Sequence, residues 1–138
     1  MSMSSLMPSR FLSLVAHFVI LVTAMSDKKA NVLASLPWDF TEEEWNGKMR
    51  ELSAGLIVSL VFICVELVTF LFGVTMFLPM QSVISIFCHG GGAITMGIFL
   101  VDVWDTYWFW WSFGVFSAVP FACELASVTS VLCLFKGT

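Results

Sequence analysis

Long apolar runs alternate with short polar connections along the chain. The apolar runs cover about residues 7–25, 52–77, 80–101 and 107–135. A helix needs roughly 20 residues to cross the hydrocarbon core of a bilayer. The last three runs meet that length, and the first meets it if its N-terminal end lies in the headgroup zone. Because the runs are continuous rather than alternating, they predict helices, and so an all-α membrane protein: a four-helix antiparallel transmembrane bundle, one domain over residues 1–138.

Composition narrows the class of protein further. Hydrophobic residues make up 59% of the chain and charged residues 12%, with a formal net charge of −4. These values exclude a disordered chain, a basic nucleic-acid-binding face and an ordinary water-soluble enzyme. The first run has a second interpretation, because Arg10, an apolar stretch and then Val22-Thr23-Ala24 resemble a secretory signal with its cleavage site. His17, in the middle of that stretch, argues against a signal.

The only sizeable connection is the loop over residues 27–51. Within it, Thr41-Glu42-Glu43-Glu44 matches a capping box, in which Thr41 and Glu44 bond to each other's backbone amides. We therefore predict a short interfacial helix over residues 42–51 that leads into the second span; a solvated acidic turn is the alternative. Taken alone, the positive-inside rule places this loop in the cytoplasm, because it carries Lys28, Lys29, Lys48 and Arg50.

Each span carries one ionisable residue at membrane depth, where such groups are costly: His17, Glu66, His89 and Glu124. Counted from the side of the termini, all four lie roughly 12–15 Å deep at 1.5 Å per residue. This predicts one polar layer inside the bundle. The layer has several interpretations: hydrogen bonds that hold the helices in register, a proton- or cation-coupled transport path, a haem ligated by His17 and His89, or residues that are satisfied individually.

Small residues and a proline mark contacts between helices. Gly90, Gly91 and Gly92 lie in mid-helix, and with Gly97 they predict a face where a neighbouring helix packs closely. Pro120 predicts a kink four residues before Glu124. The four cysteines lack zinc-site spacing, and the sequence contains no recognised catalytic or phosphate-binding motif. We therefore expect no catalytic residue, metal or cofactor.

Short segments spread along the chain carry a family resemblance. In order they are Pro8-Ser9-Arg10-Phe11-Leu12, Ala16-His17, Leu36-Pro37, Phe40-Thr41, Glu43-Glu44, Val65-Glu66-Leu67, Gly73-Val74, Met76-Phe77, Gln81-Ser82, Ile84-Ser85-Ile86, His89, Tyr107-Trp108, Ser117-Ala118, Pro120 and Glu124. In order and spacing the chain resembles the transmembrane protein 107 family of the ciliary transition zone. It departs from the family in a basic C-terminal tail reduced to Lys136 and in Glu42, where the family has proline.

The resemblance implies a function and a set of partners. It implies a non-enzymatic subunit of the Meckel-syndrome (B9) complex, together with tectonics, B9-domain proteins and other small transmembrane proteins. Such a subunit supports the ciliary membrane diffusion barrier, the protein composition of the cilium, ciliogenesis and Hedgehog signalling. The resemblance also implies cytosolic termini, opposite to the charge count.

Two hypotheses follow from these observations. In the first, Thr41 and Glu44 face a partner or order the loop, while Glu66, His89 and Glu124 fix the bundle, and the surroundings are membrane lipids rather than nucleic acid. In the second, the chain is a small tetraspan transporter that uses Glu66 or Glu124 as a titrating site.

Overall fold

The structure is a computed structural model that describes residues 2–137. Over these residues it is helical, with no strand. The elements are α1 (Met3–Ser26), α2 (Lys29–Ala34), α3 (Glu42–Leu71), α4 (Pro79–Val101), α5 (Thr106–Phe113), the π-helical stretch η1 (Gly114–Ala118) and α6 (Val119–Lys136). Four helical segments are long and apolar enough to cross a membrane: α1, α3, α4 and the continuous stretch from α5 to α6. The prediction of an all-α, four-span membrane protein is confirmed.

The first loop differs in detail from the prediction. Residues 42–51 are helical, but they form the first turns of α3 and run into the second span without a break. The capping box starts the helix at Thr41, and no proline follows to stop it before the apolar residues begin. The short helix that lies in this loop is α2, which the sequence reading did not identify.

The turn between the second and third spans is specified by its own residues. Gly73 has a φ of 78°, which glycine adopts without steric strain. Its amide bonds to the Phe70 carbonyl, and the Val74 amide bonds to the Thr69 carbonyl, both at 3.0 Å. This is the Schellman pattern, and it ends α3 at Leu71, earlier than the predicted residue 77. Pro79 then occupies the first turn of α4, where its missing N–H is not needed.

The predicted irregularity at Pro120 takes the form of a π-helical stretch. Residues Gly114–Ala118 have π-helical bonding, and Pro120 follows directly in the first turn of α6. Proline cannot donate a backbone hydrogen bond, and its ring crowds the carbonyl four residues earlier. A wider turn before Pro120 relieves both problems.

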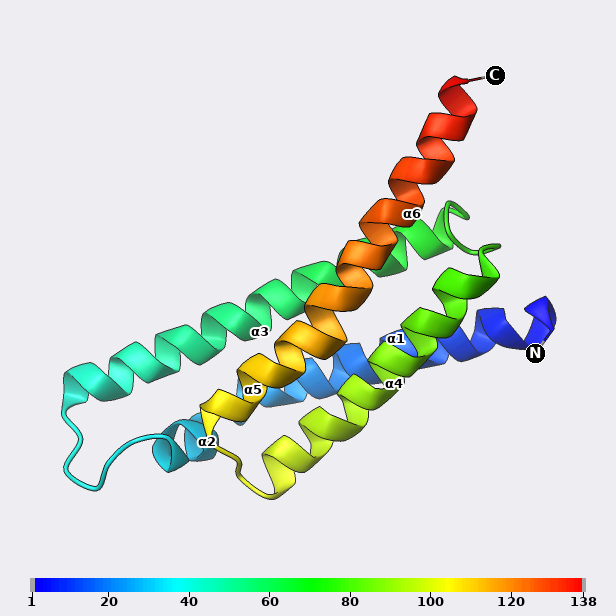
Figure 1. The fold of residues 1–138 in the computed structure, drawn as a ribbon. Helices are drawn as coiled ribbons and strands as arrows, with labels where there is room; N and C mark the ends of the chain where they lie inside the picture. The colour runs from blue at the N-terminus through cyan, green and yellow to red at the C-terminus, as the bar shows by residue number, and fades with distance from the viewer. Residues whose placement is uncertain (1, 138) are drawn as a thin grey trace.

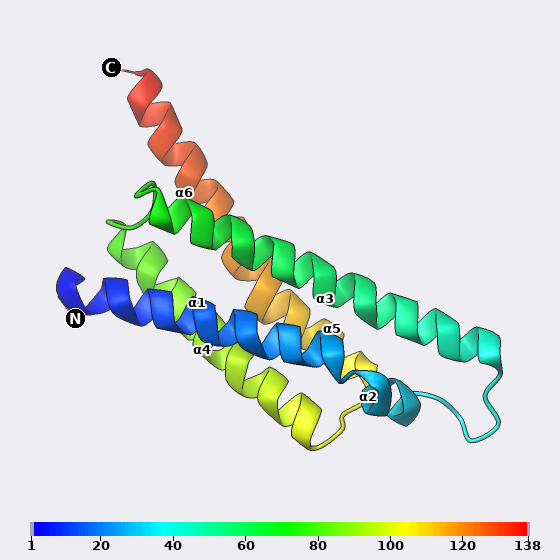
Figure 2. The same cartoon turned by 180° about the vertical axis from the view of Figure 1, so that it is seen from behind.

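The spans are arranged so that the first and third lie side by side and run parallel (Figures 1 and 2). The contact between α1 and α4 is the most extensive between any two elements. An apolar core that includes Leu21, Leu56, Met96 and Phe99 fills the half of the bundle near α2. In the other half α6 leaves the bundle and continues past the turn between α3 and α4 (Figure 1).

Three hydrogen bonds dock the first loop onto the end of α4 and the start of the fourth span. The Asn31 side-chain amide donates to the Phe99 carbonyl at 2.8 Å and to the Trp104 carbonyl at 2.9 Å. The backbone amide of Thr106 donates to the Ser35 hydroxyl at 2.8 Å. These bonds fix α2 against the start of the fourth span.

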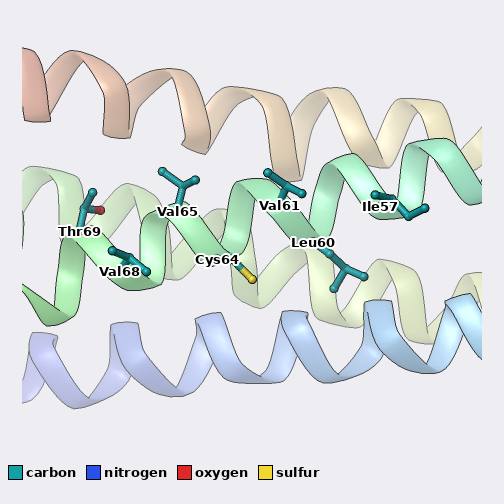
Figure 3. Close-up of a pocket in the computed structure, with 7 residues that line it drawn as sticks. All are labelled: Ile57, Leu60, Val61, Cys64, Val65, Val68 and Thr69. Atoms are coloured by element: carbon teal, nitrogen blue, oxygen red, sulfur yellow. The ribbon is translucent and has the colours of Figure 1, made fainter.

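The outer surface of the bundle is apolar, as a lipid-facing surface requires. A shallow groove runs along the outside of α3, as Figure 3 shows, and its lining is almost free of polar atoms. All of its lining residues belong to α3: Ile57, Leu60, Val61, Cys64, Val65, Val68 and Thr69. The ionisable groups of the spans must therefore be sought inside.

Candidate functional site: two buried polar clusters

The first cluster surrounds an ion pair between the first and fourth spans. Arg10 Nη2 lies 2.8 Å from Glu124 Oε2, and both side chains are fully buried. Arg10 Nη1 also donates to the Thr75 carbonyl at 3.0 Å, and the guanidinium carbon lies 5.1 Å from the centre of the Phe70 ring. A charge at this depth is tolerated only when it is paired and hydrogen-bonded, and both conditions are met.

Three side chains besides Arg10 donate hydrogen bonds to Glu124. The Thr75 hydroxyl and the Gln81 side-chain amide each donate to its carboxylate at 2.6 Å, and the Thr69 hydroxyl donates as well. With Arg10 that makes four donors, about the full capacity of a carboxylate. The arginine cluster (Arg10, Thr69, Thr75, Gln81 and Glu124) therefore ties α1, α3, the α3–α4 turn, α4 and α6 together at one point.

The second cluster is a chain of three residues from three spans. His17 Nδ1 lies 2.9 Å from His89 Nδ1, and His89 Nε2 lies 2.9 Å from Glu66 Oε2. All three side chains are buried. This histidine chain (His17, His89 and Glu66) joins α1, α4 and α3.

The hydrogen bonds of the histidine chain constrain its protons. Each of the two links needs one proton between its heavy atoms, because a lone pair does not bond to a lone pair. Three arrangements satisfy both links with no net charge. In the first, an imidazolium at His89 donates to both neighbours. In the second, an imidazolium at His17 donates to His89, which donates to the Glu66 carboxylate. In the third, a protonated Glu66 donates to His89, which donates to His17. A neutral chain suits a buried site of low dielectric constant.

Glu124 does not share a layer with the other three ionisable residues, so the single polar layer predicted above needs correction. The predicted depth of Glu124 assumes that the fourth span ends at the same height as the other three. In the structure, α6 extends well beyond the α3–α4 turn. Glu124 therefore meets Thr75 in that turn, nearer to the end of the bundle.

The sequence reading missed Arg10, Thr69, Thr75 and Gln81 as members of a site. In the sequence, Arg10 is assigned only to a possible signal sequence and to a segment of the family resemblance. The available signal was its spacing of seven residues from His17, which places the two on one face of a helix. The Thr and Gln positions carried no such signal, because their roles depend on where Glu124 arrives.

The imidazole geometry does not fit a haem held between His17 and His89. A metal–nitrogen bond of about 2.0–2.1 Å would separate two opposed ligand atoms by roughly 4 Å. The two Nδ1 atoms lie 2.9 Å apart and face each other. Residues 2–137 also contain no group of three or more His, Cys, Asp or Glu side chains placed to hold a metal ion.

Of the four glycines assigned to a helix contact, two face a neighbouring helix closely. A Cβ built on Gly92 would lie 2.6 Å from His17 Cε1, and one on Gly91 would lie 2.8 Å from Phe116 Cε1. Gly90 and Gly97 face open space, with no atom within 4 Å of a built Cβ. The absence of a side chain at Gly92 thus makes room for the His17 ring beside α4.

The capping box in the first loop is present as the sequence indicated. The Thr41 amide donates to Glu44 Oε2 at 2.7 Å, and the Glu44 amide donates to Thr41 Oγ1 at 3.2 Å. Both residues are exposed and lie at the opposite end of the bundle from the arginine cluster. They belong to neither buried cluster.

We expect His89→Leu to destabilise the bundle more than His17→Leu. His89 is the middle of the histidine chain, so its loss breaks two hydrogen bonds and leaves the Glu66 carboxyl without a partner. His17 is an end member, and its loss breaks one. An unsatisfied buried polar group costs about 1–3 kcal/mol. The measurement is the free energy of unfolding of both variants in detergent micelles. Equal losses of stability would contradict the central position of His89 in the histidine chain.

Comparisons with known proteins identify the family. A family model described as TMEM107, a transmembrane protein, matches residues 6–128. The chain belongs to the transmembrane protein 107 family. The Xenopus laevis transmembrane protein 107 is 40% identical over 124 residues, 90% of this chain and 89% of that protein. The Homo sapiens protein is 39% identical over 133 residues, 96% of this chain and 95% of that protein.

A less similar relative also matches over most of the chain. The Danio rerio transmembrane protein 107 is 33% identical over 124 residues, 90% of this chain and 92% of that protein. No solved structure matches the chain significantly. The segment that matches the transmembrane protein 107 model, residues 6–128, contains every member of both buried clusters. Family membership and four membrane-spanning helices together make this a multi-pass membrane protein.

Proposed function

We propose that this chain is a non-enzymatic membrane subunit of the ciliary transition-zone complex. Membership of the transmembrane protein 107 family over residues 6–128 carries the proposal. In that role the chain supports the ciliary membrane diffusion barrier, the protein composition of the cilium, ciliogenesis and Hedgehog signalling. Tectonics, B9-domain proteins and other small transmembrane proteins are its partners, and both termini lie in the cytosol.

The use of the buried polar residues supports an assembly role. Arg10, Glu124, His17, His89 and Glu66 bond to one another or to neighbouring helices and so fix the bundle. The fourth span, by contrast, is mostly exposed in the single chain. Only 11% of its apolar 18-residue stretch is buried, against 28–33% of the corresponding stretches in the other three spans. A span so poorly covered by its own chain is available to lipid and to helices of partner proteins.

Proximity labelling in ciliated cells tests the proposal. The labelling enzyme is fused to the N-terminus in one cell line and to the C-terminus in another. Enrichment of tectonics and B9-domain proteins at the ciliary base, from both fusions and with cytosolic labelling, is the expected result. A distribution through other membranes without these neighbours would contradict it.

We expect Glu44→Gly to weaken the association with partners while the bundle remains folded. The substitution removes both capping-box bonds and adds a glycine to the first turn of α3, a local loss of about 1–2 kcal/mol. Residues 35–44, including the exposed Trp38, would lose their fixed connection to α3. The measurement is co-purification with tectonic-type partners at equal expression.

Glu43→Gly is the matched control for this prediction. Glu43 is also exposed in the first turn of α3, but its side chain makes no capping bond. It tests the loss of helix propensity without the loss of the cap. Normal co-purification of Glu44→Gly, or an equal loss in both variants, would contradict a role for the capping box.

A second candidate function is a proton- or cation-coupled transporter that uses Glu66 or Glu124. One observation favours it: Glu66 Oε1 is buried and has no partner among the described residues. Glu124 is a weaker candidate, because all of its bonding capacity is occupied. The test is pH-driven flux in liposomes, expected to vanish in Glu66→Gln; absence of flux across a panel of ions and cationic solutes would remove this candidate.

A further inference from the structure

Five buried side-chain polar atoms lack a hydrogen-bond partner within the part of the chain that the structure describes, and four of them belong to the half of the bundle that contains the clusters. These four are Arg10 Nε, Glu66 Oε1, Ser82 Oγ and Ser85 Oγ. A fifth, Asn31 Oδ1, belongs to α2 at the other end. Such atoms are unfavourable in a protein interior and nearly always have a partner.

The register between α1 and α4 places Ser82 at the level of the arginine cluster and Ser85 between that cluster and the histidine chain. The helices run parallel, and the bond between His17 and His89 fixes an offset of 72 residues. Arg10 is then level with Ser82, and Ser85 lies roughly 4.5 Å further toward His89. Ser82, Ser85 and His89 share the buried face of α4.

Glu66 on α3 and Leu14 on α1 are the other residues that bear on this space. On α3, Glu66 lies one turn from Thr69, a member of the arginine cluster. On α1, the buried residue between Arg10 and His17 is Leu14, which offers no polar atom. The stretch of α1 between the two clusters therefore has Leu14, and no polar side chain, on its buried face.

The two serines behave differently from Ser59 and Ser127. Ser59, equally buried on α3, donates to the Gly55 carbonyl at 2.9 Å, and Ser127 donates to the Cys123 carbonyl at 2.9 Å. This bond to the preceding turn is open to any helical serine. The hydroxyls of Ser82 and Ser85 are fully buried and do not make it, so their own helix does not satisfy them.

The mixture of donors and acceptors identifies the ligand. Arg10 Nε can only donate, a carboxylate oxygen accepts, and the two hydroxyls do both. A metal cation would be repelled by the guanidinium, and an anion offers no hydrogen-bond donor to Glu66 Oε1. Water alone complements all four, and buried water typically makes about three hydrogen bonds to groups of this kind.

We propose that ordered water occupies the space bounded by Arg10, Ser82, Ser85 and Glu66, and links the arginine cluster to the histidine chain. The two clusters then form one hydrogen-bonded network from the α3–α4 turn to His17. The network ends there, because apolar residues such as Leu21, Met96 and Phe99 fill the bundle beyond it. The water therefore does not continue past His17 toward α2.

Radiolytic hydroxyl-radical footprinting of the full chain in lipid nanodiscs tests the site, because radicals formed from bound water modify the side chains next to it. We expect His89 and Leu14 to be modified several-fold more than Met96. Met96 is the internal control: it is buried like them and intrinsically more reactive, but it lies two turns beyond His89 in the dry core. Modification of His89 no greater than that of Met96 would overturn the proposal.

A double variant, Ser82→Ala with Ser85→Ala, provides the second arm. It removes two of the four partners of the water, and a buried water needs several polar partners to be held in place. We expect the modification of His89 to fall to the level of Met96, while Ser59→Ala leaves it unchanged. Unchanged modification in the double variant would overturn the proposal; if that variant fails to fold, the comparison of His89 with Met96 in the unaltered chain decides.

Discussion

Replacing Arg10 with methionine is expected to destabilise the bundle by about 3–5 kcal/mol, the usual result of removing one member of a buried ion pair. Methionine keeps the apolar volume of the arginine stem but leaves the Glu124 carboxylate without its charged partner. Thr69, Thr75 and Gln81 would still donate to Glu124, but none of them carries a charge. The measurement is the free energy of unfolding in detergent micelles or bicelles.

Two further variants separate the ion pair from general effects of the substitution. Adding Glu124→Gln to Arg10→Met removes the uncompensated charge, so the double variant should regain a large part of the lost stability. Arg50→Met is the matched control on an exposed position, with an expected change within about 0.5 kcal/mol. A double variant as unstable as Arg10→Met alone would show that the charge pairing is not the cause.

The second large effect is expected at Gly92. An alanine there would place its Cβ 2.6 Å from His17 Cε1 and 2.9 Å from Phe116 Cβ. Neither neighbour can move easily, because the His17 ring bonds to His89 and the Cβ of Phe116 is fixed to its backbone. We expect Gly92→Ala to cost about 1–3 kcal/mol, the usual range for overpacking.

Gly90 supplies the control for this substitution two residues away in the same helix. A Cβ on Gly90 meets no atom within 4 Å, so Gly90→Ala should raise stability by about 0.5–1 kcal/mol through reduced backbone entropy. The unfolding free energies of the two variants are compared directly. Equal changes in the two variants would show that α1 does not pack against Gly92 as described.

The number and type of the spans could be predicted from the sequence, because bilayer thickness and backbone hydrogen bonding leave few alternatives for a long apolar run. The start of α3 at Thr41 could also be predicted, since a capping box involves only residues within one turn. For the same reason Pro120 indicated an irregular helix. Gly73 indicates the end of α3, because glycine commonly ends a helix. The apolar residues that follow it nevertheless extend the predicted span to residue 77.

The pairing of the buried polar residues could not be obtained in this way. His17, Glu66, His89 and Glu124 stand out along the chain, but their partners depend on which helices are adjacent and how far each one extends. Arg10 is the clearest case, because its partner Glu124 is 114 residues away. Its number of residues from the end of the span predicts that Glu124 lies level with the histidines. In the structure it lies beside Arg10, because α6 extends past the α3–α4 turn.

The sequence by itself therefore determined a four-span helical membrane protein with costly polar groups inside and a capping box at the start of the helix that contains the second span. Each of these features is set by local composition and by the bilayer. Only the tertiary structure decided that α1 packs in parallel against α4, that Gly92 faces His17 while Gly90 faces outward, and that the polar residues form two clusters. Those features depend on helix register and crossing, which side-chain packing between distant segments fixes and local sequence does not.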